Sequence, residues 1–307
     1  MLLISIILPC YNEELAIKGT YKELSSIMQQ MGNDYEFIFV DDGSKDTTFS
    51  MLRELSLQDN CVRYIQFSRN FGKEAALLAG LQRAKGQYIV VMDVDLQDPP
   101  SLIPQMFEAV ASGEYDCAGT RRITRAGEPP IRSLFARMFY SLMTKFTDIE
   151  IVDGARDFRL MSRPYVDAVL SLPERNRFSK GIFPWVGFKT KWFEYENIQR
   201  STGETKWSFG KLFLYSLDGI IAFSSKPMAI ASILGILLFL SSLFLIGFII
   251  LRKAFWGDPV AGWASTICII LFCSGIQLFT AGILGQYISK IYIEVKKRPY
   301  FIIKEEK

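Results

Sequence analysis

Apolar residues form short continuous runs in the first part of the chain, and longer stretches of mixed apolar and polar residues separate them. The runs cover residues 4–8, 36–40, 62–67 and 88–92, and the longer stretches cover roughly residues 15–31, 47–57 and 73–84. Continuous apolar runs of this length are typical of parallel strands that are covered on both faces. Their alternation with helical stretches predicts an α/β fold with a doubly wound, Rossmann-like, mostly parallel sheet.

Two long uncharged stretches lie near the C-terminus, at residues 228–251 and 259–289. A helix of about 24 residues is about 36 Å long, which is enough to cross a bilayer. Two buried core helices are the alternative, which these lengths disfavour. We therefore predict two C-terminal transmembrane helices within residues 227–289, at about 228–251 and 264–287.

Basic residues flank the two uncharged stretches unequally. Only Arg252 and Lys253 stand in the loop between them, whereas the segments on either side carry Lys206, Lys211, Lys226, Lys290, Lys296, Lys297, Arg298 and Lys304. Basic side chains favour the cytoplasmic side of a membrane. This pattern predicts a multi-pass protein of the inner (plasma) membrane, with the large domain and both termini in the cytoplasm.

The pattern divides the chain into an α/β domain at residues 1–208, the two spans at 227–289 and a cytoplasmic tail at 290–307. Between domain and spans, residues 209–226 form a predicted amphipathic helix at the membrane interface. Most of this segment is apolar, and only Lys211 and Asp218 are charged before Lys226. A domain helix packed on its neighbours is the alternative for this segment.

The composition excludes several kinds of chemistry. The 307-residue chain has no histidine, so histidine bases, triads and metal ligands are excluded. Its five cysteines show no metal-ligand spacing, which predicts a reduced protein. A net charge of +3, without a basic stripe interleaved with aromatic residues, predicts no nucleic-acid partner. Carboxylates, lysines, arginines, hydroxyls and backbone groups remain for catalysis.

Polar clusters follow three of the predicted strands, at residues 9–14, 41–46 and 93–100. The carboxyl ends of the strands form the usual ligand-binding edge of an open α/β sheet. Asp93 and Asp95, two positions apart after a buried strand, offer hard oxygen ligands that suit Mg²⁺ or Mn²⁺ bound together with substrate phosphates. Capping of the following helices explains any one cluster. Three clusters at one edge favour a binding site.

Four segments make the resemblance to a known family specific. They are ISIILPCYNEE, FIFVDDGSKDTT, SRNFGKEAALLAGLQRAKG and VVMDVDLQDPP, at residues 4–14, 37–48, 68–86 and 90–100. These segments are similar to GT-A glycosyltransferases of family 2, and they look most like the branch with dolichyl-phosphate mannose synthases and bacterial bactoprenol glucosyltransferases. RDFRLMSR and the paired C-terminal spans also resemble the bactoprenol enzymes. The resemblance covers the chain nearly end to end and implies a GT-A fold for residues 1–208.

The resemblance implies roles for the residues that match the family's motifs. The positions that hold the nucleoside are matched by Pro9, Tyr11, Glu13 and Asp42. The positions that touch the ribose–diphosphate and the metal are matched by Asp93, Asp95 and Gln97. An acidic position near the acceptor is matched by Asp157, and basic positions against the lipid phosphate are matched by Arg121 and Arg132. Processive members carry Gln-x-x-Arg-Trp, and residues 199–207 lack that spacing, which argues against polymer synthesis.

The chemistry of the implied acceptor reduces the need for a base. A polyprenyl phosphate is ionised at neutral pH, so its oxygen can attack the sugar without losing a proton. The site must then bring two anionic substrates together, which calls for a metal ion and for cations such as Arg200 and Lys206. Asp157 is then either a base or a residue that orients an arginine or the acceptor.

Together with the residues above, the resemblance implies a metal-dependent hexosyltransferase that moves one sugar, glucose from UDP-glucose, onto undecaprenyl phosphate with inversion. One alternative keeps the fold and uses GDP-mannose or another UDP-sugar. The other is a non-catalytic membrane scaffold that only binds a nucleotide sugar. Small residues in the spans, such as Gly235, Gly247 and Gly282, permit close helix contact and predict a homo-oligomer.

Overall fold

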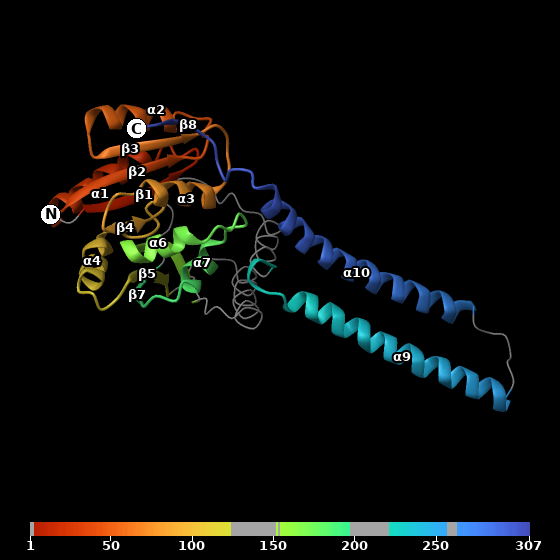
Figure 1. The fold of residues 1–307 in the computed structure, drawn as a ribbon. Helices are drawn as coiled ribbons and strands as arrows, with labels where there is room; N and C mark the ends of the chain where they lie inside the picture. Colours follow the sequence, from red (N-terminus) through yellow and green to blue (C-terminus); the bar gives the residue numbers. More distant parts are fainter. Residues whose placement is uncertain (1–2, 124–151, 153, 197–220, 257–262) are drawn as a thin grey trace.

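A computed structural model describes residues 3–123, 152, 154–196, 221–256 and 263–307 (Figure 1). Its centre is an eight-stranded sheet with the order β7-β5-β6-β4-β1-β2-β3-β8. In chain order the strands are β1 (Leu3–Cys10), β2 (Asp34–Asp41), β3 (Val62–Phe67), β4 (Tyr88–Val91), β5 (Cys117–Arg122), β6 (Ala155–Ser162), β7 (Thr190–Tyr195) and β8 (Ile303–Glu306).

The sheet is mixed but mostly parallel. β1 pairs in parallel with β2 and β4, β2 with β3, and β5 with β7. The antiparallel pairs are β4 with β6, β5 with β6 and β3 with β8. The predicted α/β fold is confirmed, and the strands predicted from the apolar runs are β1 to β4.

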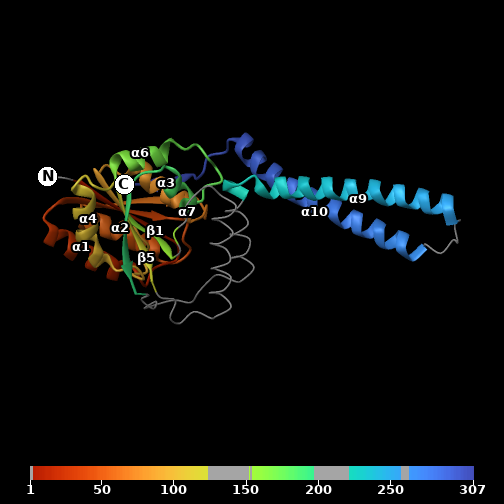
Figure 2. The ribbon, with the colours of Figure 1, turned by 90° about the horizontal axis from the view of Figure 1, so that it is seen from below.

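Helices cover both faces of the sheet (Figures 1 and 2). One face carries α1 (Ile17–Met31), α2 (Thr48–Gln58) and α4 (Ile103–Ala111), which follows the short 3-10 helix η1 (Pro100–Leu102). The other face carries α3 (Lys73–Arg83), α6 (Arg163–Ser171) and α7 (Ser179–Trp185). Ile6 and Ile7, neighbours in β1, belong to the two different cores. This alternation explains why the parallel strands read as continuous apolar runs.

The close approach of α3 to the sheet depends on a glycine. A Cβ atom at Gly80 would lie 2.3 Å from Cγ2 of Ile7, so no larger residue fits there without movement. Close packing of this kind fixes the position of a helix against its sheet. The N-terminal end of α3, which carries Lys73, is therefore held firmly at the carboxyl edge of the strands.

Two long helices leave the domain side by side, α9 (Lys226–Trp256) and α10 (Trp263–Lys296) (Figures 1 and 2). Apolar side chains along both are exposed, with Phe244 at 76% and Leu278 at 74%. Among the residues that the structure describes, one stretch, Lys226–Phe244, meets the length and composition needed to cross a membrane.

The C-terminal segment differs from the predicted tail. α10 continues to Lys296, and Ile303–Glu306 return to the domain as β8 at the edge of the sheet. Pairing with a strand so distant in the sequence leaves no local signal, which is why the pattern of charges alone predicted a tail. The predicted interfacial helix at residues 209–226 lies outside the described residues except for residues 221–226.

Candidate active site

The loops that follow β1 and β2 are joined by hydrogen bonds. The backbone N–H of Asn12 donates to the Ser44 hydroxyl at 2.9 Å, and that of Glu13 donates to the Thr48 hydroxyl at 2.9 Å. Asn12 has a φ of 54°, a left-handed conformation that asparagine tolerates better than most residues. Tyr11 and Glu13, both predicted to contact the nucleoside, therefore lie on a loop that is fixed against its neighbour.

Asp42 joins the loop after β2 to the loop after β3. Its carboxylate accepts hydrogen bonds from the backbone N–H groups of Phe71 (2.6 Å) and Gly72 (2.9 Å). Gly43 has a φ of 68°, and a Cβ atom there would lie 2.5 Å from the carbonyl carbon of Arg69. Burial raises the pKa of the Asp42 carboxyl above its usual value. The predicted nucleoside ligand thus also sets the position of the residues that precede α3.

The loop after β4 carries the Asp-x-Asp motif in a constrained shape. Leu96 has a φ of 53°, and non-glycine residues in this conformation are concentrated at functional sites. The Thr20 hydroxyl of α1 donates to the carbonyl oxygen of buried Val94, and the backbone N–H of Gln97 donates to Oδ1 of Asp95 at 3.3 Å. Val94 therefore anchors the loop in the core while Asp95 and Gln97 stay partly exposed at the edge.

Lys73 joins the Asp-x-Asp motif to Asp157, the acidic residue predicted to lie near the acceptor. Its ammonium group lies 2.7 Å from Oδ1 of Asp93 and 2.6 Å from Oδ2 of Asp157. Burial opposes the effect, but the carboxylates of Asp157 and Asp93 raise the pKa of Lys73. Burial also favours neutral Asp157, yet the charges of Lys73 and Lys180 lower the pKa of Asp157 well below its usual range. Both members are therefore charged at neutral pH.

Glu74, the residue after Lys73, fixes the start of α3 against the start of α7. The carboxylate of Glu74 accepts hydrogen bonds from the backbone N–H of Ser179, at 3.1 Å, and from the Ser179 hydroxyl. Burial raises the pKa of Glu74. The contact ties the N-terminal ends of α3 and α7 together, so the backbone of Lys73 cannot shift independently of α7.

A second polar cluster, formed by Asp98, Arg156 and Tyr195, supports the loop after β4. Asp98 is only 2% exposed, and it accepts hydrogen bonds from Nε of Arg156 at 3.0 Å and from the Tyr195 hydroxyl. Arg156 also reaches the side-chain oxygen of Gln97 at 3.4 Å. Burial raises the pKa of Asp98. Asp98 is buried, and two side chains hold its carboxylate, so this cluster fixes the loop rather than performing chemistry.

The residues present fit a divalent ion only together with a phosphate ligand. Within the described parts of the chain, no group of three or more His, Cys, Asp or Glu side chains is arranged to hold a metal by itself. Asp93 and Asp95 stand partly exposed at one edge, with Gln97 beside them. Mg²⁺ and similar ions commonly bind through one or two carboxylates plus substrate phosphates. The site is consistent with that mode.

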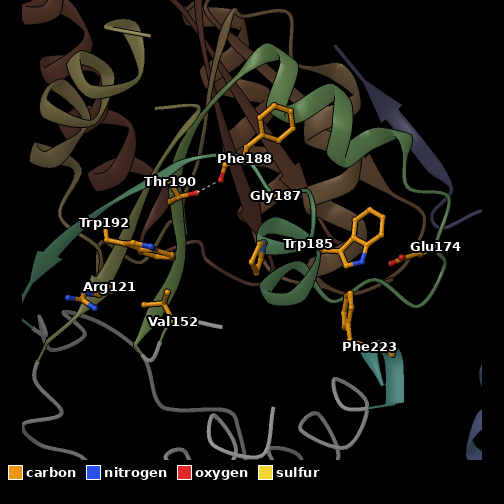
Figure 3. A pocket seen from close by; sticks show the side chains of 11 residues that line it. Arg121, Val152, Glu174, Trp185, Gly187, Phe188, Thr190, Trp192 and Phe223 are labelled. Carbon is orange, nitrogen blue, oxygen red and sulfur yellow. Dashed lines mark hydrogen bonds between the residues drawn. The ribbon is translucent and has the colours of Figure 1, made fainter. Parts of the chain in front are cut away.

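A cavity of about 920 Å³ lies near β5 and β7, which follow β6 in the order of the sheet. Figure 3 shows Arg121 and Trp192 on one side of this cavity and Trp185 and Phe223 on the other. The guanidinium of Arg121 forms an ion pair with Glu194. Four aromatic side chains line the cavity, with a cation at one end and the residues that lead into α9 at the other.

The structure brings part of the predicted site together. Asp93 and Asp157 share Lys73, while Pro9, Tyr11, Glu13 and Asp42 lie on neighbouring strand ends and loops of β1 and β2. Arg121 lies at the end of β5, in the separate cavity. The predicted residues Arg132, Arg200 and Lys206 lie outside the described residues.

Sequence reasoning missed four charged residues of this region: Lys73, Glu74, Asp98 and Arg156. Lys73 and Glu74 stand in the quoted segment SRNFGKEAALLAGLQRAKG directly after a glycine. That position at a predicted helix start, next to a strand end, was the available signal for Lys73.

A Rossmann-like sheet with acidic loops at its carboxyl edge is the arrangement of a nucleotide-binding α/β enzyme. The family model described as "Glycosyl transferase family 2" matches residues 5–170. The chain is 41% identical over 306 residues to a bactoprenol glucosyl transferase of Shigella phage SfV, covering 99% of both chains. It is also 44% identical over 301 residues to the uncharacterized glycosyltransferase YkcC of Bacillus subtilis (strain 168), covering 98% of this chain and 93% of that one. The chain therefore belongs to glycosyl transferase family 2 and is a glycosyltransferase.

Solved structures support the fold assignment. A glucosyl-3-phosphoglycerate synthase from Mycobacterium tuberculosis, crystallised with Mn²⁺, UDP and phosphoglyceric acid, matches with a TM-score of 0.52 and 19% identity. The match covers 72% of this chain and 76% of that one. At this identity the similarity concerns the fold, and the GT-A architecture predicted from the sequence is confirmed.

Proposed function

We propose that this glycosyltransferase moves a single glucose from UDP-glucose to undecaprenyl phosphate, or a related polyprenyl phosphate, at the cytoplasmic face of the membrane. The observation that carries this proposal is the similarity to bactoprenol glucosyl transferases over essentially the whole chain, including α9 and α10. The reaction joins the phosphate oxygen of the lipid to the anomeric carbon and releases the nucleoside diphosphate, with inversion of configuration.

The proposed donor site uses the carboxyl edge of β1, β2 and β4. Pro9, Tyr11, Glu13 and Asp42 would hold the nucleoside, since their loops are fixed to one another and partly exposed. Buried Asp42 offers carboxylate oxygens at this edge, and a carboxylate is suited to accept hydrogen bonds from a base or a ribose.

The proposed metal site consists of Asp93, Asp95 and Gln97, with Mg²⁺ or Mn²⁺ as the ion. When bound with the donor, such an ion neutralises the charge that develops on the leaving diphosphate. The anchoring of Val94 and Asp98 in the core supports this role, because it holds the motif in one shape.

The contacts of Asp157 favour an orienting role over that of a general base. Its carboxylate is charged and already engaged by Lys73 at 2.6 Å. The phosphate acceptor carries no proton that must be removed, so the greater requirement is for cations that offset repulsion between two anions. Arg121, Arg132, Arg200 and Lys206 are the residues proposed to meet the acceptor phosphate or the diphosphate.

In this proposal the membrane helices α9 and α10 place the domain next to the lipid acceptor. The two long helices would both cross the membrane, with both termini on the cytoplasmic side. Their exposed apolar side chains, such as Phe239 (61%) and Phe279 (61%), support contact with lipid. The aromatic cavity next to Phe223 is a suitable place for the first apolar units of the acceptor, since it adjoins the start of α9.

A transfer assay tests the proposal. Full-length protein in liposomes with undecaprenyl phosphate is incubated with labelled UDP-glucose, UDP-N-acetylglucosamine, UDP-galactose or GDP-mannose, each with Mg²⁺, Mn²⁺ or EDTA. We expect an organic-extractable labelled product from UDP-glucose that is lost in EDTA. Product from another donor would correct the sugar. Product from no donor would contradict the proposed acceptor or catalysis itself.

A further inference from the structure

The ammonium group of Lys73 lies between Asp93 of the proposed metal site and Asp157 of the proposed acceptor site. It contacts both oxygens of Asp93, at 2.7 and 2.9 Å, and one oxygen of Asp157, at 2.6 Å. The side chains of Lys73, Asp93 and Asp157 are 41%, 33% and 18% exposed, so solvent and small ions reach the cluster from one side. A cation of the protein thus already holds the first carboxylate of the Asp-x-Asp motif.

The backbone of Lys73 is fixed by its neighbours, whereas its side chain has several rotatable bonds. The preceding N–H groups of Phe71 and Gly72 are held by Asp42, and the following residue, Glu74, is held by Ser179. A lysine side chain has a flexible four-carbon stem that ends in a compact point charge. The ammonium can therefore leave Asp93 without any change in the position of α3.

A divalent ion and this ammonium compete for Asp93, because two cations held at one carboxylate repel each other at close range. Mg²⁺ and Mn²⁺ prefer carboxylate oxygens at short distance, and both oxygens of Asp93 are in contact with Lys73. Metal binding to Asp93 is then opposed by the charge of the ammonium, which has Asp157 as its other partner among the described residues.

We propose that Lys73 is a resident counter-cation that competes with the divalent metal for Asp93 and keeps metal affinity low until the donor diphosphate supplies further ligands. The inference rests on the proposed metal site. Lys73 acts here as a positioning residue, which holds the two acidic side chains near each other and offsets their mutual repulsion. Metal and nucleotide would then bind together rather than metal first.

The test measures Mn²⁺ binding by the fall in the free-ion EPR signal, with full-length protein in detergent, with and without UDP. Without UDP, Lys73→Met should bind Mn²⁺ about tenfold more tightly than the wild type, since a contacting charge is removed. Lys180→Met is the matched control, because Lys180 also acts on Asp157 but is not in contact with Asp93 in this structure. We expect the Mn²⁺ affinity of this control, measured without UDP, to differ from that of the wild type by less than about twofold.

A second variant separates competition from net charge and from misfolding. Lys73→Met combined with Asp157→Asn removes one positive and one negative charge, and it leaves no buried carboxylate without a partner. This double variant should still bind Mn²⁺ more tightly than the wild type in the absence of UDP. Wild-type affinity in both Lys73 variants would overturn the inference while leaving the metal site intact. Absence of Mn²⁺ binding in every protein, even with UDP, would overturn the metal site as well.

Discussion

At the scale of single residues, the site separates residues that are fixed from residues that are accessible. Asp98 and Val94 are buried, whereas Asp93 and Asp95 are partly exposed on the same short loop. On this loop the buried Asp98 is held by Arg156 and Tyr195, whereas ligands can reach the partly exposed Asp93 and Asp95. The buried residues Val94 and Asp98 therefore hold the loop in place, and the partly exposed residues Asp93 and Asp95 are the ones that can bind ligands.

Substitution of Asp95 tests this separation. Asp95→Ala should lower sugar transfer by about 100-fold or more, because a ligand of the proposed metal is lost. The melting temperature should change by less than about 2 °C, since the side chain is partly exposed and outside the core. Glu114→Ala removes an exposed carboxylate elsewhere on the surface and serves as the control. Normal transfer by Asp95→Ala would mean that the metal lies elsewhere.

The sequence was sufficient to identify Asp93, Asp95 and Asp157 as candidates, because their motifs are local. It did not identify Lys73, whose partners Asp93 and Asp157 are 20 and 84 positions away. No local pattern specifies which cation will meet two carboxylates from different strands. The same reason explains why buried Asp98 and its partner Arg156, 58 positions apart, were not paired.

At the scale of secondary-structure elements, β8 connects the end of α10 to the loop that precedes the site. The backbone N–H of Ser68 donates to the carbonyl oxygen of Ile302 at 2.9 Å. The ring of Phe301 stacks on Phe67 of β3, with centroids 4.8 Å apart and an interplanar angle of 12°. Phe67 in turn meets Phe71, the residue whose N–H group is held by Asp42. The segment that leads into β8 thus supports a loop of the proposed donor site.

Removal of the stacked ring tests the importance of this connection. Phe301→Ala should lower the free energy of unfolding by about 2 kcal/mol, since a half-buried aromatic pair is lost. This change corresponds to a fall of about 4–8 °C in the melting temperature of a domain of this size. Glu306→Ala, which breaks an exposed ion pair with Arg83, should cost less than about 1 kcal/mol. Equal effects of both variants would contradict the proposed support by Phe301.

Elements were predictable where the hydrophobic pattern is local and continuous. The four parallel strands and the helices between them follow from their apolar runs, because both faces of these strands are buried. β8 has exposed residues at alternate positions, and β7 exposes Lys191 and Glu194, so both edge strands carry charged residues that face solvent. Their pairing depends on partners far along the chain, so the sequence pattern did not reveal them.

At the scale of the whole molecule, the site faces the side from which the long helices leave. The N-terminus lies on the far side of the domain from α9 and α10, so β1 runs toward the helices and its carboxyl end faces them (Figures 1 and 2). The loops of the proposed donor site follow the carboxyl ends of the strands. If both helices cross the membrane, as proposed, a lipid phosphate at the membrane surface needs no long movement to reach the sugar.

The proposed topology gives the last prediction. A cysteine placed at Asp258, between the two helices, should react with a membrane-impermeant maleimide added outside intact cells, because the basic flanks keep the domain and both termini inside. A cysteine at Lys304, in β8, should react only after the membrane is opened. Labelling of the unsubstituted protein gives the background signal from its own five cysteines. Labelling of the Lys304 site from outside, with protection of the Asp258 site, would reverse the orientation and place the donor site away from cytoplasmic nucleotide sugars.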